Sequence, residues 1–497
     1  MNFNYLSAIV LLPVIGAILI AFIPGFSDRL IKRIAAIITI IPFALSIFLF
    51  VIFDKSAGAA GVIQFEEKLS WISAVNAHYH LGVDGLSLPL VVLTAFLGFM
   101  VVLISWKEHH RVREYFAWLL LLETSILGVF SSLDLLLFFI FWEIEIIPMY
   151  FLISIWGAGR KEYSAIKYVV YTLFGSAFML AGILSLYFTT GSLSMVDLSQ
   201  KGLAMVQSIM PAAPMFFMLL TGFAIKLPVV PLHTWLPDAH TDAPTAGSVM
   251  LAGALIKMGG YGMIRVCVSI FPQVARDFAP LLVVLAVISV LYGAAITLRQ
   301  TDLKRLIAYS SVSHMGYVLL GIFALGQVSL TGAALQMVSH GLLTGLLFAM
   351  AGLTMHNVGE RDLRKLGGLA RQLPVITLVF SIAGLGSLGL PTTSGFAAEF
   401  IVFTGSFMST VVSGIRVYTI LAVLGVVVSA GYILWMIQRV FYGPVLEQYN
   451  KAKDADTVDK IYMFAFVALI MLVGIYPAIL TDIIKFGISP IMRLLGG

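Results

Sequence analysis

The sequence predicts an all-α polytopic membrane protein with about 14 transmembrane helices, arranged as two inverted repeats of five helices. The chain is 60% hydrophobic and 11% charged, whereas about 25% of the residues in a soluble domain are charged. Apolar runs of about 20 residues, the length that crosses a bilayer, recur along all 497 residues. Each expected repeat also contains one helix broken by proline, helices 7 and 12, which is typical of transport proteins.

The expected spans lie near residues 5–23, 33–53, 84–105, 114–131, 133–155, 166–189, 212–232, 245–268, 277–298, 305–326, 328–354, 373–406, 414–441 and 459–480. No linker or low-complexity segment separates them, so we predict a single integral membrane domain over residues 1–497. Within it the helices from 5–23 to 84–105 form an N-terminal group. Residues 114–268 form the first repeat, 277–441 the second, and 459–497 a C-terminal helix with an interfacial tail.

The segments outside the spans carry weaker patterns. The alternation in VIQFEEKLSWI, within the loop 54–82, predicts a surface hairpin or a half-buried strand. Residues 482–493 predict a short interfacial helix. The first apolar run has no basic region before it and no small-residue cleavage site, so we expect a retained helix. The single cysteine, Cys267, excludes an intrachain disulfide and a cysteine-bound metal or iron–sulfur cluster.

The basic residues predict the orientation in the membrane. On the face opposite the termini the loops carry 19 of the 30 lysines and arginines, against seven on the face of the termini. Because basic loops stay on the cytoplasmic side, both termini are expected on the outer, periplasmic side of a bacterial inner membrane. The basic loops on one membrane face explain the net charge of +5, so we expect no nucleic acid as a partner.

The most informative stretch runs from Lys226 to Lys257. Lys226 lies in an apolar helix, Pro228 and Pro231 follow it, and His233 comes before the polar segment PDAHTDAP. Proline breaks the helical hydrogen-bond ladder, and a broken helix inside a bilayer is tolerated where it faces protein or a water-filled cavity. Two lysines buried beside such a break indicate an ion path.

Helix 5 carries two carboxylates, Glu143 and Glu145, in its apolar middle. Two residues correspond to about 200° around a helix, so the two side chains are not expected to face one path. A hydrogen-bonded carboxyl at a helix interface is the structural alternative. Each charge at the bilayer centre costs roughly 2.5–3.5 kcal/mol on insertion scales, which favours a functional use when several occur together.

The second half repeats this plan with His314 on an intact helix and Glu399 after the proline break of helix 12. Glu143 precedes Lys226 by 83 residues, and His314 precedes Glu399 by 85. His340 lies on the helix between them. A single histidine in a membrane helix is usually a hydrogen-bonding group. Three of them, His233, His314 and His340, beside lysines and a glutamate favour a proton relay, because imidazole exchanges protons near neutral pH. The histidines do not occur in the paired pattern of haem ligands.

Other polar residues allow two interpretations. Lys167 either extends to the membrane surface or pairs with Glu143. Asp238, His240 and Asp242 form either a solvated turn, the favoured interpretation, or a point of proton uptake or release. Glu123 lies in an apolar run with no partner that the sequence suggests.

Five segments resemble the antiporter-like subunits of respiratory complex I, and most closely their subunit M, or subunit 4, branch. These segments are YHLGVDGLSLPLVVLT, FFIFWEIEIIPMYFLI, FAIKLPVVPLHTWLPDAHTDAPTAGSV, LKRLIAYSSVSHMGYV and LPTTSGFAAEF. Thr392 and Ala398 stand where this family usually has glycine. The resemblance covers nearly the full length of the chain.

The resemblance implies a proton-translocating subunit of the membrane arm of NADH:quinone oxidoreductase. It implies Glu143 and Lys226 as a proton-loading pair, with Glu145 outside the path. Lys257, His314 and His340 follow as the central relay, and Glu399 as the group on the release side.

The chain itself shows no redox or nucleotide-binding motif. NADH, FMN, iron–sulfur clusters and quinone are therefore expected in partner subunits, with subunits of the L and N types as neighbours. A subunit of a multisubunit sodium/proton antiporter and a scaffold that does not pump remain as alternatives.

Overall fold

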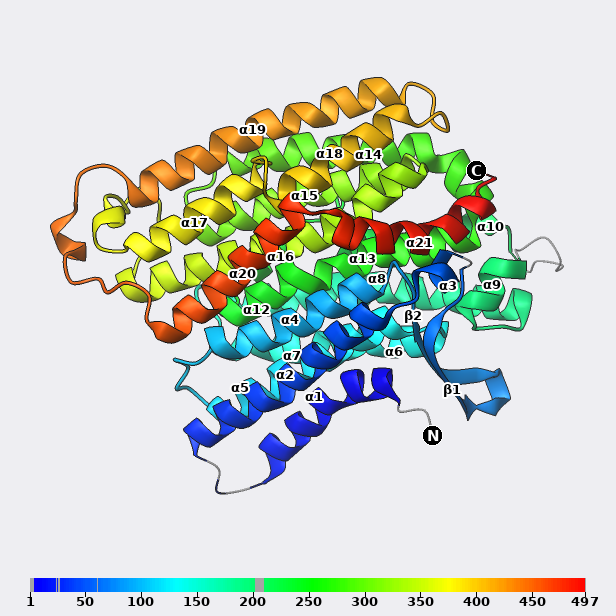
Figure 1. The fold of residues 1–497 in the computed structure, drawn as a ribbon, viewed down its shortest axis with the longest axis horizontal. Coiled ribbons are helices and arrows are strands. Elements are labelled where there is room, and N and C mark those ends of the chain that lie inside the picture. The colour runs from blue at the N-terminus through cyan, green and yellow to red at the C-terminus, as the bar shows by residue number, and fades with distance from the viewer. Residues whose placement is uncertain (1–3, 24, 26, 60, 202–209, 497) are drawn as a thin grey trace.

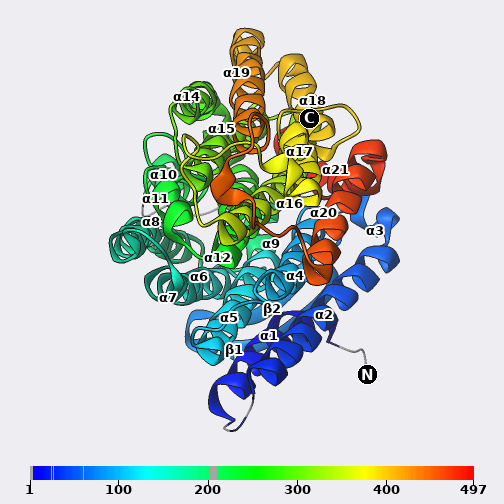
Figure 2. The same cartoon turned by 90° about the vertical axis from the view of Figure 1, so that its left-hand side faces the viewer.

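The computed structural model describes residues 4–23, 25, 27–59, 61–201 and 210–496. In these residues long helices run side by side, and both ends of the chain lie at the same end of the bundle as the β-hairpin (Figures 1 and 2). Eleven helical segments are long and apolar enough to cross a membrane, and four shorter helices are also apolar. The predicted all-α polytopic class is confirmed, whereas the count of 14 spans, the inverted repeats, the domain divisions and the orientation stay predictions.

The N-terminal half, up to the first broken helix, contains α1 (Tyr5–Phe22), α2 (Asp28–Ile52), α3 (Lys55–Ala59), β1 (Gln64–Ile72), β2 (Ala77–Val83), α4 (Leu88–Ile104), α5 (Val112–Ser131), α6 (Leu135–Ile144), α7 (Ile146–Trp156), α8 (Lys161–Thr190), α9 (Met195–Lys201), α10 (Ala212–Lys226) and α11 (Trp235–Asp242). The remainder contains α12 (Thr245–Met250), η3 (Leu251–Leu255), α13 (Ile256–Gly262), η4 (Met263–Val268), α14 (Pro272–Thr297), α15 (Leu303–Phe323), α16 (Gln327–Val358), α17 (Pro374–Ser387), α18 (Ser394–Met408), α19 (Ile415–Phe441), α20 (Thr457–Ile475) and α21 (Ala478–Leu494). Short 3₁₀ turns at Ser73–Val75, Leu369–Arg371 and Glu447–Tyr449 complete the described elements.

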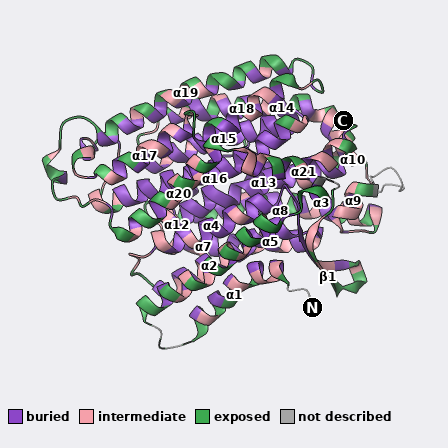
Figure 3. Ribbon diagram, in the orientation of Figure 1, coloured by how far each residue is buried: buried purple, intermediate pink, exposed green. Residues whose placement is uncertain are grey.

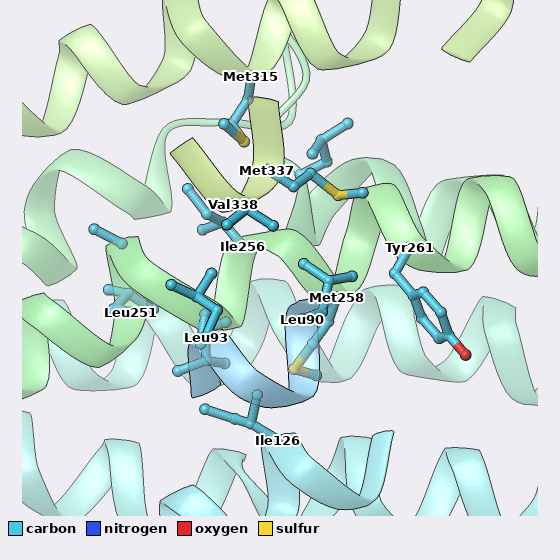
Figure 4. Close-up of a cluster of buried hydrophobic side chains, with 14 of the residues drawn as sticks. Leu90, Leu93, Ile126, Leu251, Ile256, Met258, Tyr261, Met315, Met337 and Val338 are labelled. Atoms are coloured by element: carbon cyan, nitrogen blue, oxygen red, sulfur yellow. The ribbon is translucent and has the colours of Figure 1, made fainter. Parts of the chain in front are cut away.

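The helices divide into a buried centre and a periphery (Figure 3). The most apolar stretch of α16 is entirely buried and that of α15 is 94% buried, against 28% for α2 and 39% for α19. Around the centre, Leu93 of α4, Ile256 of α13 and Val338 of α16 lie in one apolar cluster (Figure 4). Ionisable side chains on the central helices are therefore removed from both water and lipid.

The loop 54–82 forms an antiparallel hairpin of β1 and β2, as its alternating pattern predicts. The hairpin also holds the start of α1, because the Glu67 carboxylate accepts hydrogen bonds from the backbone N–H groups of Leu6 at 2.8 Å and Ser7 at 3.0 Å. A carboxylate at a helix N-terminus satisfies unpaired amides and opposes the positive end of the helix dipole. The helix expected at 482–493 is part of the longer α21.

The fifth predicted span, residues 133–155 and called helix 5 above, is interrupted at Glu145, which separates α6 from α7. Pro148 has no N–H to donate to the carbonyl of Ile144, so the ladder of α6 ends there. The start of α6 is fixed by Asp134, whose carboxylate accepts from the N–H groups of Leu136 and Leu137. The straight helix assumed from the sequence is therefore bent at the acidic pair.

The seventh predicted span, residues 212–232, breaks directly after Lys226, where α10 ends, as Pro228 and Pro231 predict. The segment that follows corrects one expectation. Asp238, His240 and Asp242 do not lie in a solvated turn: they belong to the buried helix α11. The polar composition of PDAHTDAP suggested a turn, but α8, α12 and α15 enclose this helix and remove it from solvent.

The eighth predicted span, residues 245–268, contains two π-helical segments, η3 and η4, on either side of α13. A π-helical turn leaves backbone carbonyls outside the regular i to i−4 ladder, and such turns often occur at functional sites. In α13 the sequence MGGYG brings the helix against α10. A Cβ atom added at Gly259 would lie 2.5 Å from the carbonyl oxygen of Phe223 and 2.6 Å from the nitrogen of Leu227. Only glycine permits this close approach of α13 to α10.

Replacing Gly259 by alanine is therefore expected to separate α10 from α13 and to lower the thermal stability of the assembled protein. The cost is about 1–3 kcal/mol, as for other residues forced into a closely packed interior. Gly431, where no atom lies within 4 Å of an added Cβ, provides the matched control. Equal melting temperatures for Gly259→Ala and Gly431→Ala would contradict the close contact.

The second break separates α17 from α18 at residues 388–393. Gly389 has φ +83° and Thr392 has φ +79°. Thr392, which stands where the family usually has glycine, thus adopts the left-handed backbone that glycine takes without strain. For a β-branched residue this conformation costs of order 1–3 kcal/mol. The break keeps a glycine-type backbone at this position although the glycine is missing.

Candidate functional site

The Lys226 side chain forms an ion pair with Glu145, and both side chains are almost fully buried. Glu145 also accepts a hydrogen bond from the Tyr168 hydroxyl of α8. The Lys226 Nζ atom lies 5.4 Å from the centre of the Trp142 ring and 5.5 Å from that of Tyr168. A buried charge persists when it is paired and hydrogen-bonded, so three elements, α6–α7, α8 and α10, together hold this ammonium group.

The resemblance implied Glu143 as the partner of Lys226, and in this respect the structure corrects it. Glu143 is only half-buried, and it lines a groove between α7 and α8 on the outside of the bundle. Among the described residues, its Oε1 atom has no hydrogen-bond partner. The angular argument was right that the two carboxylates diverge. Which one faces inward depends on the bend at Glu145 and on the packing of α8 and α10.

Lys257 lies on α13 in the centre of the bundle, with no exposed surface. Its Nζ atom lies 2.7 Å from Nδ1 of His340 on α16, and it also donates to the carbonyl oxygen of Ala252 in the π-helical segment η3. A carbonyl of the π-helical segment thus contacts the buried lysine side chain. Nε2 of His340 has no partner among the described residues.

His314 continues this line from α15. Its ring centre lies 5.6 Å from that of His340, and its Nδ1 atom lies 3.1 Å from Oε1 of Glu399 on α18. The Ser387 hydroxyl at the end of α17 contacts the other ring nitrogen at 3.3 Å. Lys257, His340, His314 and Glu399 therefore form a row that runs from α13 through α16 and α15 to α18.

The structure brings the predicted residues into two groups, the Lys226 pair and the row that begins at Lys257. No described hydrogen bond or ion pair joins the groups. Their helices touch at Gly259, which follows Lys257 by two residues and lies against Leu227, the neighbour of Lys226. The arrangement suits proton transfer, because each group places basic nitrogens beside a carboxylate inside an apolar interior.

His233 lies apart from both groups. Its ring packs on Tyr292 and Tyr309 at centre distances of 5.3 and 6.4 Å, and its Nδ1 atom has no hydrogen-bond partner among the described residues. Glu123 of α5 is also buried, with both carboxylate oxygens unpaired and packed against Gly98 of α4.

One acidic and three basic side chains form an ionic cluster around Asp238 of α11. Asp238 pairs with Lys167 at 2.7 Å, with Arg305 at 3.5 Å and with Arg160 at 3.9 Å. Lys167 therefore neither extends freely to the membrane surface nor pairs with Glu143, the two expectations from the sequence. Asp242 accepts a hydrogen bond from Ser164 at 2.6 Å.

His240 lies between this cluster and Lys257. It is fully buried, both of its ring nitrogens lack hydrogen-bond partners among the described residues, and its ring is stacked on Phe348 at 4.6 Å. Lys257 and Lys304 lie close enough to its ring to interact with it electrostatically. From the sequence alone, His240 lies at a point of proton uptake or release only in the less favoured of two interpretations. Its position four residues before the second proline of PDAHTDAP gave no sign that the segment is a buried helix.

Sequence reasoning also missed Tyr168 and dismissed Glu145. The repeated acidic pattern in WEIE was the available signal for Glu145, but only the bend of helix 5 turns it toward Lys226. In the part of the chain that the structure describes, no group of three histidine, cysteine or acidic side chains is arranged to hold a metal ion.

Comparison with known proteins agrees with this architecture. A family model described as the transmembrane region of NADH:quinone oxidoreductase and Mrp antiporters matches residues 132–425. Subunit M of the NADH-quinone oxidoreductase of Rhodobacter capsulatus is 38% identical, over 99% of this chain and 96% of its own. Chain 4 of the NAD(P)H-quinone oxidoreductase of Synechococcus elongatus is 39% identical, over 97% of this chain and 90% of its own.

Solved structures give the same result. A chain of respiratory complex I from Thermus thermophilus, with bound NADH, matches 99% of this chain with a TM-score of 0.88 and 27% identity. A chain of the Mrp complex from Dietzia has a TM-score of 0.87 at 19% identity, which shows a shared fold. Because the family model covers more than half of the chain and the relatives cover nearly all of it, this chain belongs to the antiporter-like membrane subunits of NADH:quinone oxidoreductase, and among them to the subunit M, or chain 4, type.

Proposed function

We propose that this chain translocates protons across a bacterial inner membrane as a membrane-arm subunit of NADH:quinone oxidoreductase. The chain then acts as part of an enzyme whose redox chemistry takes place elsewhere. NADH, FMN, iron–sulfur clusters and quinone belong to partner subunits in this proposal, and both termini face the periplasm. The observation that carries the proposal is the buried row Lys257–His340–His314–Glu399.

The first step in this proposal is a change at the Lys226–Glu145 pair. A conformational or electrostatic signal from quinone reduction in a neighbouring subunit loosens the pair. Without its carboxylate, a buried ammonium group is strongly disfavoured. Lys226 then gives its proton toward a neutral Lys257 across the contact of α10 with α13 and becomes a neutral amine.

The later steps use the row. Lys257 passes a proton to Nδ1 of His340, and His340 releases one from Nε2 toward His314. Glu399 accepts the proton from His314 and releases it toward the periplasm. His240 and the Asp238 cluster supply the next proton from the opposite face. His233 has only a secondary role in this relay, because no contact among the described residues joins it to the row.

Subunits of the L and N types are the proposed neighbours. Glu143 supports one such contact, because its half-buried carboxylate lines a groove of about 520 Å³ that is otherwise apolar. A carboxylate at this depth is stabilised when a partner supplies a donor or a positive charge. We therefore propose that Glu143 transmits the signal between subunits and that Glu145 holds Lys226.

The test is to measure NADH-driven electron transfer and proton pumping together in membrane vesicles that contain Glu143→Gln or Glu145→Gln. Both variants are expected to assemble and to lose most of their pumping, and the double variant is expected to pump no better than either. Glu114→Gln, which changes an exposed carboxylate that pairs with Arg111, is the matched control. If the chain is a scaffold that does not pump, the complex is expected to pump at the wild-type rate in both single variants and in the double variant.

The sodium/proton antiporter alternative shares the fold, and the same vesicles distinguish it. Proton uptake that continues unchanged in sodium-free buffer supports proton translocation. Uptake that requires sodium would favour the antiporter assignment.

A further inference from the structure

A groove of about 420 Å³ runs between α1 and α5 on the outside of the bundle. The helix α1 lies at the edge of the structure in both views (Figures 1 and 2). Apart from Arg113 and Glu114, the walls of the groove are apolar, and in α1 they include Ile18 and Phe22, which are 55% and 79% exposed. Ala17 and Ala117 leave it hollow between the larger side chains. Apolar side chains at this position face lipid hydrocarbon when the bundle is in a bilayer.

Arg113 lines one end of this groove, in the first turn of α5. It is half-buried, and among the described residues no hydrogen bond or ion pair engages its guanidinium group. The neighbouring Glu114 is instead bound by Arg111 at 3.4 Å. An arginine stays charged at any physiological pH, and a charge partly removed from water requires a counter-charge.

We propose that this groove binds a phospholipid, whose phosphate is held by Arg113 and whose acyl chain lies between α1 and α5. Arginine binds phosphate through two parallel N–H donors. The start of α5 adds the positive end of a helix dipole. Trp118, one turn further along the groove, provides an indole of the kind that is enriched at the level of lipid headgroups.

The charge around the groove favours an anionic headgroup. Arg29 and Arg33, in the first two turns of α2, lie on the same end of the bundle as the start of α5 (Figure 1). Basic residues beside a membrane helix attract anionic lipids. The inference does not depend on proton transport, because none of these residues belongs to the Lys226 pair or to the Lys257 row.

The test uses the assembled complex reconstituted in vesicles of phosphatidylcholine that contain phosphatidylglycerol with a photoreactive group in its acyl chain. After illumination, mass spectrometry is expected to find the lipid attached to residues 14–22 and 113–121. Arg113→Gln is expected to reduce this labelling about tenfold, the effect of losing a charge-assisted hydrogen bond. Arg299→Gln, which removes an exposed arginine after α14 and outside the groove, is expected to leave the labelling unchanged.

A second variant separates loss of the phosphate contact from loss of the groove. Ala117→Trp fills the groove without changing charge and is expected to abolish labelling. Wild-type complex with no label on α1 or α5, or equal labelling in wild type and Arg113→Gln, would overturn the proposal. So would a photoreactive residue in place of Ala21 that attaches to another subunit instead of lipid, since the groove would then be a protein interface.

Discussion

Replacing Lys226 by alanine is expected to abolish proton pumping while the complex still assembles. Lys226 is the direct partner of the buried Glu145. Removing one member of a buried ion pair costs roughly 3–5 kcal/mol, because the other charge is left without compensation. Glu145 is therefore expected to take up a proton and stay neutral. The pair then has no charge to exchange with Lys257, and NADH-driven pumping falls to the background of the measurement.

A double variant separates the effect on stability from the effect on transport. Lys226→Met combined with Glu145→Gln removes both charges, so it is expected to recover the thermal stability that Lys226→Ala loses. Pumping is expected to stay absent. If the double variant regained pumping, the pair would be a structural contact. If Lys226→Ala itself pumped at the wild-type ratio of protons to electrons, the proposed function would be wrong at this site.

The second large effect is expected from His340→Gln. His340 is the link in the row, because it contacts Lys257 at 2.7 Å and its ring lies 5.6 Å from that of His314. Glutamine preserves a hydrogen bond to Lys257 but exchanges no proton near neutral pH. Pumping is expected to fall at least tenfold, a change that corresponds to about 1.4 kcal/mol in the barrier.

His233→Gln is the matched control for this variant. The variant makes the same substitution of histidine by glutamine. The aromatic rings that pack on His233 in the described structure are those of Tyr292 and Tyr309, and neither belongs to the row. The loss of pumping is expected to be several-fold smaller than for His340→Gln. Equal losses in both variants would mean that His233 belongs to the main path and that the row alone does not define it.

The sequence determined the class of this protein because that class depends on local properties. Apolar runs of sufficient length cannot be accommodated outside a bilayer. Pro228, Pro231 and Pro391 lack the backbone donor that a continuous helix needs, so the two breaks could be located from the residues themselves. The strand pattern of the loop 54–82 likewise gave the hairpin. Lys226, Lys257, His314, His340 and Glu399 were recognisable since a charge in an apolar helix requires an explanation.

Only the tertiary structure decided how these residues are paired. The partner of Lys226 is Glu145, because helix 5 bends at that residue and α8 and α10 close around it. Asp238 binds Lys167, and His240 is buried, because other helices enclose α11. Helical periodicity gives the angle between two side chains on one helix. It does not give the direction in which that helix faces its neighbours, which is set by packing among segments far apart in the sequence.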